Sequence, residues 1–148
     1  HGIKVNYVTY ASGEEVVANL RAGKAYDVVA VETQDVPALI AEGLLAKIDY
    51  RNVPNFKNIS ANFRDLSFDP GNAYTVPFNW GTTGLLVRSD LVEKPVTRWA
   101  DLWDERFAGK VIVWNQQRYL LGIVLKSLGY SVNSENPEQL AAALERLD

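Results

Sequence analysis

Two clusters of polar and aromatic residues follow short apolar runs, and their side chains are suited to binding a small organic molecule. The clusters are Glu32, Thr33 and Gln34 after residues 26–31, and Trp114, Gln116 and Tyr119 after residues 110–113. A carboxylate such as Glu32 can accept hydrogen bonds from an ammonium group. An aromatic face attracts an organic cation by about 0.5–2 kcal/mol. The clusters therefore indicate a binding site, for which an organic cation is a suitable ligand.

Residues 79–84 form a third candidate stretch, which lies between the two clusters in the sequence. This stretch contains Trp80, Thr82 and two glycines, and apolar runs precede and follow it. Two glycines in six residues let the backbone bend or approach a ligand closely. We interpret it as a crossing between two lobes beside a ligand cleft. A buried pair of strands with a glycine-bearing bend is the alternative, and composition alone favours it.

Structural explanations also exist for the other two clusters. Thr33 or Asp35 can cap the helix expected at residues 36–43. Each aromatic side chain can equally belong to a hydrophobic core. The residue types alone leave these alternatives open.

Several classes of chemistry have little or no support in the sequence. The chain contains no cysteine, and its single histidine is His1, so neither a Ser/His/Asp triad nor a His/Cys metal site is expected. No glycine-rich phosphate-binding motif is present. The net charge is −3 and basic residues do not cluster, which argues against nucleic-acid binding. We therefore expect a binding protein without catalytic residues, metal or cofactor.

The elements that position these clusters follow an alternating pattern. Continuous apolar runs of strand length followed by helical patterns are typical of a parallel sheet covered by helices. The expected strands are residues 3–9, 26–31, 44–48, 74–78, 85–87 and 110–113. The expected helices are residues 12–23, 36–43, 59–63, 97–103 and 118–128, and one that begins near Pro137. Ser12 with Glu15, Thr97, and Ser134 or Asn136 are the expected caps.

Short stretches along nearly the whole chain are similar to a known family. They are Gly2-Ile3-Lys4-Val5, Tyr26-Asp27-Val28-Val29, residues 42–49, residues 68–77, Trp80-Gly81-Thr82-Thr83, Trp99-Ala100-Asp101-Leu102-Trp103, Gly109-Lys110 and Leu128-Gly129-Tyr130-Ser131. In order and spacing these stretches resemble bacterial extracellular solute-binding proteins, family 1, which serve ABC importers. Within that family they resemble the spermidine/putrescine-binding proteins most.

This resemblance implies an α/β fold of the type II periplasmic-binding-protein class, with two lobes built on mostly parallel sheets. It implies that the chain is incomplete. Residues 1–80 would be part of lobe 1 without its first strand and helix, and residues 81–148 part of lobe 2 without its C-terminal remainder. It further implies a periplasmic or lipid-anchored protein that passes a polyamine to a permease. Apolar surface left uncovered in such a fragment would favour self-association.

The resemblance also assigns ligand contacts. By alignment, the first-lobe contacts fall on Glu32 and Gln34, where polyamine binders have Ser and Tyr. The second-lobe contacts fall on Gln116 and Tyr119, where they have Asp and Glu. A neutral or anionic solute is therefore the alternative ligand, and an enzyme or a sensor on the same fold is a more distant alternative.

Overall fold

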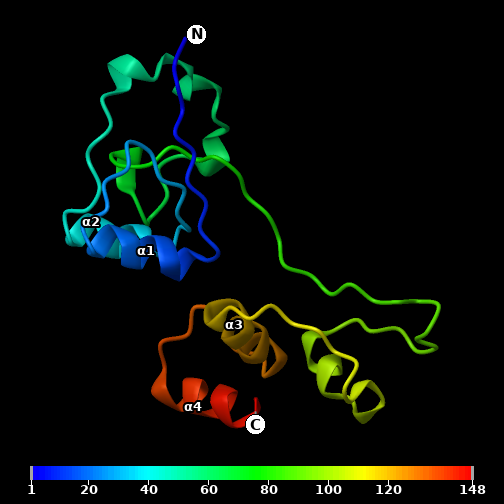
Figure 1. Cartoon of the computed structure of the whole chain (residues 1–148). Coiled ribbons are helices and arrows are strands. Elements are labelled where there is room, and N and C mark those ends of the chain that lie inside the picture. The colour runs from blue at the N-terminus through cyan, green and yellow to red at the C-terminus, as the bar shows by residue number, and fades with distance from the viewer. Residues whose placement is uncertain (1, 148) are drawn as a thin grey trace. The chain divides into compact units, whose positions relative to one another are not determined.

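The structure, a computed structural model, describes residues 2–147 (Figure 1). The chain divides into two compact units, His1–Gly81 and Thr82–Asp148. No helix within the described part of the chain is long and apolar enough to cross a membrane.

The first unit contains the helices α1 (Gly13–Arg21) and α2 (Val36–Ala41). The Ser12 hydroxyl accepts the backbone N–H of Glu15 at 3.2 Å, which satisfies one of the free donors at the start of α1. The Glu15 carboxylate accepts the backbone N–H of Ala11 at 2.7 Å. The predicted cap is confirmed, but Glu15 reaches one residue further back than in a standard capping box.

The core of the first unit lies between these two helices and the segments that flank them. Val17 and Leu20 of α1 and Leu39 of α2 are buried together. Partly buried side chains pack against them, namely Tyr26, Val29, Val31, Leu44 and Leu45. The α1 and α2 ends are also joined by an ion pair from Arg21 Nη2 to Glu42 Oε1 at 2.6 Å. The apolar run at residues 26–31 therefore packs against the two helices through part of its side chains.

Four 3₁₀ helices follow in the first unit: η1 (Tyr50–Asn52), η2 (Pro54–Asn58), η3 (Ala61–Phe63) and η4 (Pro70–Asn72). The helix predicted at residues 59–63 is thus shorter than expected and of the 3₁₀ type. Residues 69–75, called the corner below, fold back on themselves around η4. In it, Asp69 is 1 % exposed, and its Oδ2 accepts the backbone N–H of Tyr74 and of Thr75 and the Thr75 hydroxyl, at 2.7–3.0 Å. The buried carboxylate fixes the direction in which the chain leaves the corner.

The second unit contains η5 (Trp99–Trp103), η6 (Glu105–Phe107), α3 (Gln117–Ser127) and α4 (Pro137–Glu145). Its core consists of Val124 and Leu125 of α3 and Ala143 of α4, with Trp103, Leu121, Leu128, Tyr130 and Leu140 packed around them. The Trp103 indole N–H donates to the Arg146 carbonyl at 3.0 Å. One side chain of η5 thus contributes both to the core and to the hydrogen bonding at the end of α4.

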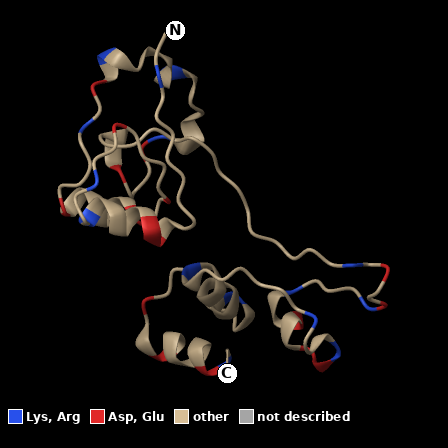
Figure 2. Cartoon of the chain, in the orientation of Figure 1, with Lys and Arg blue, Asp and Glu red and all other residues tan. Residues whose placement is uncertain are grey.

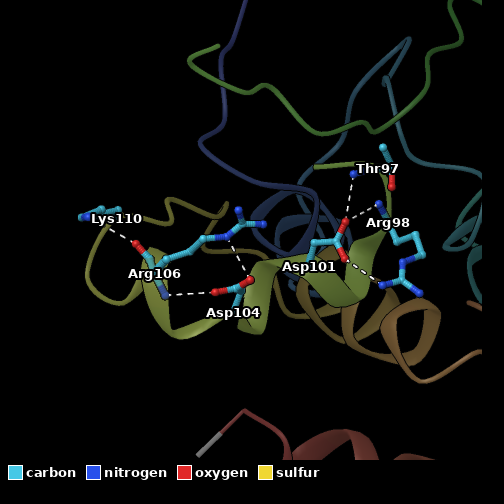
Figure 3. Close-up of polar contacts among 6 residues, drawn as sticks. All are labelled: Thr97, Arg98, Asp101, Asp104, Arg106 and Lys110. Carbon is cyan, nitrogen blue, oxygen red and sulfur yellow. Dashed lines mark hydrogen bonds and ion pairs between the residues drawn. The ribbon is translucent and has the colours of Figure 1, made fainter. Parts of the chain in front are cut away.

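The two predicted caps in this unit have different outcomes. The Asn136 side chain accepts the backbone N–H groups of Glu138 and Gln139 at the start of α4, as one alternative predicted. The prediction that Thr97 caps η5 is wrong. Asp101 instead reaches back to accept the backbone N–H of Thr97 at 2.9 Å and of Arg98 at 3.0 Å (Figure 3).

The predicted strands are not found, because no residue between 2 and 147 is in a β-strand. A strand requires a ladder of backbone hydrogen bonds to a neighbouring chain segment. The Ile48 N–H, at the end of the predicted strand 44–48, donates to the carbonyl of Ala73, just before residues 74–78, at 2.9 Å, but this single bond does not form a ladder. Ile3, Val28 and Ile112 of the predicted strands are 79 %, 90 % and 97 % exposed. The sheets of the expected fold class are therefore absent from the described residues.

Residues 76–87 contain no helix and make no backbone hydrogen bond to any other described residue. Phe78, Trp80 and Leu86 within this segment are 89 %, 72 % and 101 % exposed. The segment carries no charged residue and is drawn in tan in Figure 2. The first charged residue after it in the sequence is Arg88. The alternative reading of this stretch as a buried strand pair is therefore wrong.

Candidate functional site

The first candidate cluster lies in the turn before α2. The Glu32 carbonyl accepts the backbone N–H of Asp35 at 3.0 Å, which closes the turn. The Gln34 amide donates to Oε2 of Glu32, and this contact holds the half-buried carboxylate in place. Thr33 and Gln34 are exposed. Asp35 occupies the N-cap position of α2 without a side-chain cap hydrogen bond, so capping does not explain the acidic residues here.

The carboxylates of Glu32 and of Asp35, which directly follows this cluster, lie beside the first turn of α1. A Cβ built on Gly13 would lie 3.7 Å from Asp35 Oδ2 and 3.9 Å from Glu32 Cδ. The first turn of α1 itself carries Glu14 and Glu15. A hydrogen bond from the Glu14 backbone and a second one from Ser12 lower the pKa of Glu14. This end of the first unit therefore has a negative potential, which favours a cation.

These carboxylates do not form a metal site. Within the described part of the chain, no group of three or more His, Cys, Asp and Glu residues is arranged to hold a metal ion. The chemistry available at the cluster is hydrogen bonding and charge pairing with an organic group.

Trp80, the candidate in the connecting stretch, lies beside Phe63 of η3. The centroids of the two rings are 5.5 Å apart and the ring planes are tilted by 31°. Trp80 keeps 72 % of its surface exposed, so one large aromatic face is accessible. Thr82, two residues later, is exposed and belongs to the second unit.

The second cluster lies at the start of α3. The Trp114 and Tyr119 ring centroids are 5.6 Å apart at an angle of 86°, which is the edge-to-face arrangement that aromatic pairs favour. Trp114 remains 62 % exposed, while Tyr119 is half-buried. Gln116 occupies the N-cap position of α3 but makes no side-chain cap hydrogen bond. Gln116 lies between Trp114 and Tyr119 in the sequence, and its side chain does not cap α3.

Among the eight predicted residues, the structure brings Glu32 into contact with Gln34, and Trp114 into contact with Tyr119. The sequence does not predict the roles of two further residues, Phe63 and Asp69. Phe63 carried no signal, because a ring contact between residues 17 positions apart has no local pattern. Asp69 carried one, since Asp-Pro-Gly-Asn marked a turn, but the turn pattern does not reveal that this carboxylate is buried.

The family model for bacterial extracellular solute-binding proteins matches residues 1–148. The spermidine/putrescine-binding periplasmic protein of Escherichia coli K12 is 39 % identical over 149 residues, covering 99 % of this chain and 43 % of the relative. The putrescine/agmatine-binding protein of Pseudomonas aeruginosa is 34 % identical, covering 99 % and 44 %. The chain thus spans less than half the length of these curated relatives.

Solved structures of proteins with similar names also match the backbone of this chain. A structure assigned to a spermidine/putrescine ABC transporter of Listeria monocytogenes matches with a TM-score of 0.94 at 32 % identity, over 99 % of this chain and 46 % of the other. The spermidine/putrescine ABC transporter substrate-binding protein of Streptococcus pneumoniae matches with a TM-score of 0.77 at 33 % identity, with the same coverage. The backbone therefore follows that of a periplasmic-binding-protein fold, although its extended segments do not pair as strands. The resemblance predicted from the sequence is confirmed, and the chain belongs to the bacterial extracellular solute-binding protein family.

Proposed function

We propose that the protein containing this chain is the substrate-binding component of an ABC importer and that it binds a polyamine of the spermidine/putrescine type. The observation that carries this proposal is the 39 % identity, over 99 % of the chain, to spermidine/putrescine-binding periplasmic proteins. The proposed location is the periplasm, or the outer face of the membrane through a lipid anchor. The proposed partner is the permease of the importer, and the role is binding without catalysis.

The side chains of the first cluster support a cationic ligand. Glu32, steadied by Gln34, lies with Asp35 beside the acidic first turn of α1. A hydrogen bond between an ammonium group and a carboxylate contributes about 1.5–3 kcal/mol. We therefore assign Glu32 to one ammonium group of the ligand, with Thr33 and Gln34 beside it.

The aromatic residues support an alkyl ligand with polar ends. Trp80 and Trp114 are both largely exposed, and each is oriented by a second ring. Their faces can cover the methylene groups of a polyamine and attract its charged nitrogens. We assign Trp80 and Thr82 to the connecting stretch of the site, and Trp114, Gln116 and Tyr119 to its second half.

We further propose that the two units belong to the two lobes of the complete protein, whose sheets would be mostly parallel. Residues 76–87 would then be a hinge segment, and closure of the lobes would bury the ligand. The absence of backbone hydrogen bonds in this segment supports the assignment, since a hinge must change its φ and ψ angles at low cost.

Isothermal titration calorimetry of the full-length protein with putrescine and spermidine tests the proposal. We expect saturable binding with a dissociation constant well below about 1 mM. Absence of binding heat for both ligands at near-millimolar concentration would exclude a polyamine.

A neutral or anionic solute is the second candidate ligand. It is favoured by the second cluster, where Gln116 and Tyr119 are uncharged at neutral pH and the first turn of α3 contains no acidic residue. A thermal-shift screen of the full-length protein against amines, sugars, amino acids and phosphonates separates the two candidates. Stabilisation by sugars or anions, without stabilisation by amines, would support the second.

A further inference from the structure

Gln34 and Glu32 are joined within a single turn of the first unit. The Gln34 side-chain amide donates to Oε2 of Glu32. The turn itself is closed by the backbone N–H of Asp35, which donates to the Glu32 carbonyl at 3.0 Å. Glu32 is half-buried, whereas Gln34 is exposed. The orientation of the Glu32 carboxylate is therefore set by a neighbour two residues away and does not depend on the second unit.

The residue that orients this carboxylate is neutral. A hydrogen bond from an amide fixes the orientation without cancelling the negative charge, whereas lysine or arginine would pair with the carboxylate and compete with a cationic ligand. A carboxylate offers about four acceptor positions, so one bond from Gln34 does not saturate it. Glu32 can therefore be held by Gln34 and still accept a hydrogen bond from an ammonium group.

Holding the side chain of Glu32 before the ligand arrives affects the affinity. A glutamate side chain has several rotatable bonds, and fixing them on binding costs conformational entropy. An interaction that already restricts them in the unbound protein removes part of this cost. The bond from Gln34 should therefore raise the affinity for a cation without any contact between Gln34 and the ligand.

We infer that Gln34 is a positioning residue, which contributes to ligand affinity by holding the Glu32 carboxylate and not by touching the ligand. The family resemblance places Gln34 among the residues that contact the ligand, whereas the contact made by its amide is with Glu32. This inference rests on the proposed function, because it takes Glu32 as the partner of one ammonium group of a polyamine.

A double-mutant cycle in the full-length protein, titrated calorimetrically with putrescine up to about 10 mM, distinguishes positioning from contact. Gln34→Met keeps the length of the side chain and removes the amide, and Glu32→Ala removes the carboxylate. With Glu32 present, Gln34→Met should weaken binding by about three- to tenfold. In the Glu32→Ala background the same change should alter the affinity by less than about twofold, because no carboxylate remains to be held.

Gln139→Met is the matched control for the loss of an amide. Gln139 lies in α4, outside both candidate clusters, where its Oε1 accepts the Ser134 hydroxyl at 2.6 Å. This variant should leave the affinity for putrescine unchanged. Because Gln34 is exposed, Gln34→Met should not lower the midpoint of thermal unfolding, so its weaker binding does not arise from partial unfolding.

A second measurement needs no ligand. In the ¹⁵N-edited NMR spectrum of the full-length protein, the side-chain amide signals of Gln34 are identified by their absence from Gln34→Met. They should shift when Glu32→Ala removes their acceptor. Signals that keep their positions would show that this carboxylate does not hold the amide, and the inference would be wrong at any ligand affinity.

Different failures identify different errors. Equal losses of affinity on Gln34→Met in both backgrounds would mean that Gln34 contacts the ligand itself. No loss in either background would mean that Gln34 has no part in binding. Both results overturn the positioning role while polyamine binding stands. If neither putrescine nor spermidine binds to the unmodified protein, the proposed function itself is wrong.

Discussion

At the scale of single residues, Glu32 is the side chain on which cation binding most depends. Glu32→Gln keeps the shape and an acceptor for the Gln34 amide but removes the charge. Loss of a charge-assisted hydrogen bond of about 1.5–3 kcal/mol should weaken binding of putrescine by about ten- to a hundredfold. The measurement is calorimetric titration of the full-length variant.

Glu145→Gln provides the matched control for this change. Glu145 is exposed at the end of α4 and lies outside both candidate clusters, so its loss should leave the affinity unchanged. Equal affinities for Glu32→Gln and the unmodified protein would remove Glu32 from the site.

Asp69 is the residue whose loss should most affect stability. Asp69→Ala leaves the partly buried N–H groups of Tyr74 and Thr75 and the Thr75 hydroxyl without their acceptor. An unsatisfied donor that is fully buried costs about 1–3 kcal/mol. Because these three donors are only partly buried, water can replace part of the lost bonding, and we expect a total loss of about 2–5 kcal/mol in the free energy of unfolding. Urea denaturation followed by tryptophan fluorescence measures this loss.

The control for Asp69 is Asp90→Ala. Asp90 pairs with Arg88 at 2.6 Å, but its side chain is 61 % exposed. An exposed ion pair contributes about 0–1 kcal/mol. Similar destabilisation by both variants would mean that the corner does not depend on its buried carboxylate.

The residues also show where prediction from sequence ends. Trp114 and Tyr119 are five positions apart at a helix start, so their proximity follows from local structure. The contact between Trp80 and Phe63 does not, because the chain must first turn back through η4. The aromatic residues are evident in the sequence, but the partner of Trp80 depends on the fold.

At the scale of elements, the hydrogen bonds that cap η5 predict that the stability of the folded protein depends on pH. Hydrogen bonds from the backbone N–H of Thr97 and of Arg98 lower the pKa of Asp101 from its ordinary value of 3.8, and Arg98 lowers it further (Figure 3). Because the folded-state pKa is lower, the cap stabilises the protein above about pH 3.8 and this contribution disappears as the pH falls through the folded-state pKa.

Asp101→Asn tests this dependence. The unmodified protein should be more stable than the variant at pH 7, and the difference should shrink steadily below pH 3.8. Asp27→Asn, which also removes one carboxylate but at an exposed position, is the control for the change in net charge. Urea denaturation at several pH values measures both. A difference that is the same at pH 3 and pH 7 would contradict the role of the ionised cap.

Helices and strands were not equally predictable. The starts of α1 and α4 are set by Ser12 and Asn136, whose side chains bind N–H groups two or three residues later, so the local sequence contains the whole signal. A strand depends on a partner elsewhere in the chain. Residues 110–113 have the apolar, β-branched composition of a strand, yet Ile112 is 97 % exposed and no ladder forms.

At the scale of the whole molecule, the exposed apolar residues predict self-association. Ile3, Val5 and Tyr7 are 75–83 % exposed, and Val28 and Ile112 are at least 90 % exposed. Apolar surface of this extent favours contact with another apolar surface. We expect the isolated 148-residue chain to form dimers or larger species, with a sedimentation coefficient that rises with protein concentration.

Replacing Ile3, Val5, Val28 and Ile112 by threonine keeps the β-branched shape and reduces the apolar surface. The sedimentation coefficient of this variant should depend less on concentration. A monodisperse monomer for the unmodified chain at every concentration tested would contradict the prediction.

The exposed connecting segment also determines where a protease first cuts the chain. Residues 65–87 contain neither lysine nor arginine, so trypsin has no cleavage site there, whereas chymotrypsin can cut after Phe78 and Trp80. Cleavage requires a backbone that is accessible and free of hydrogen bonds, as residues 76–87 are. Brief chymotrypsin digestion should therefore yield two fragments that separate near residue 80, each containing the complete core of one unit.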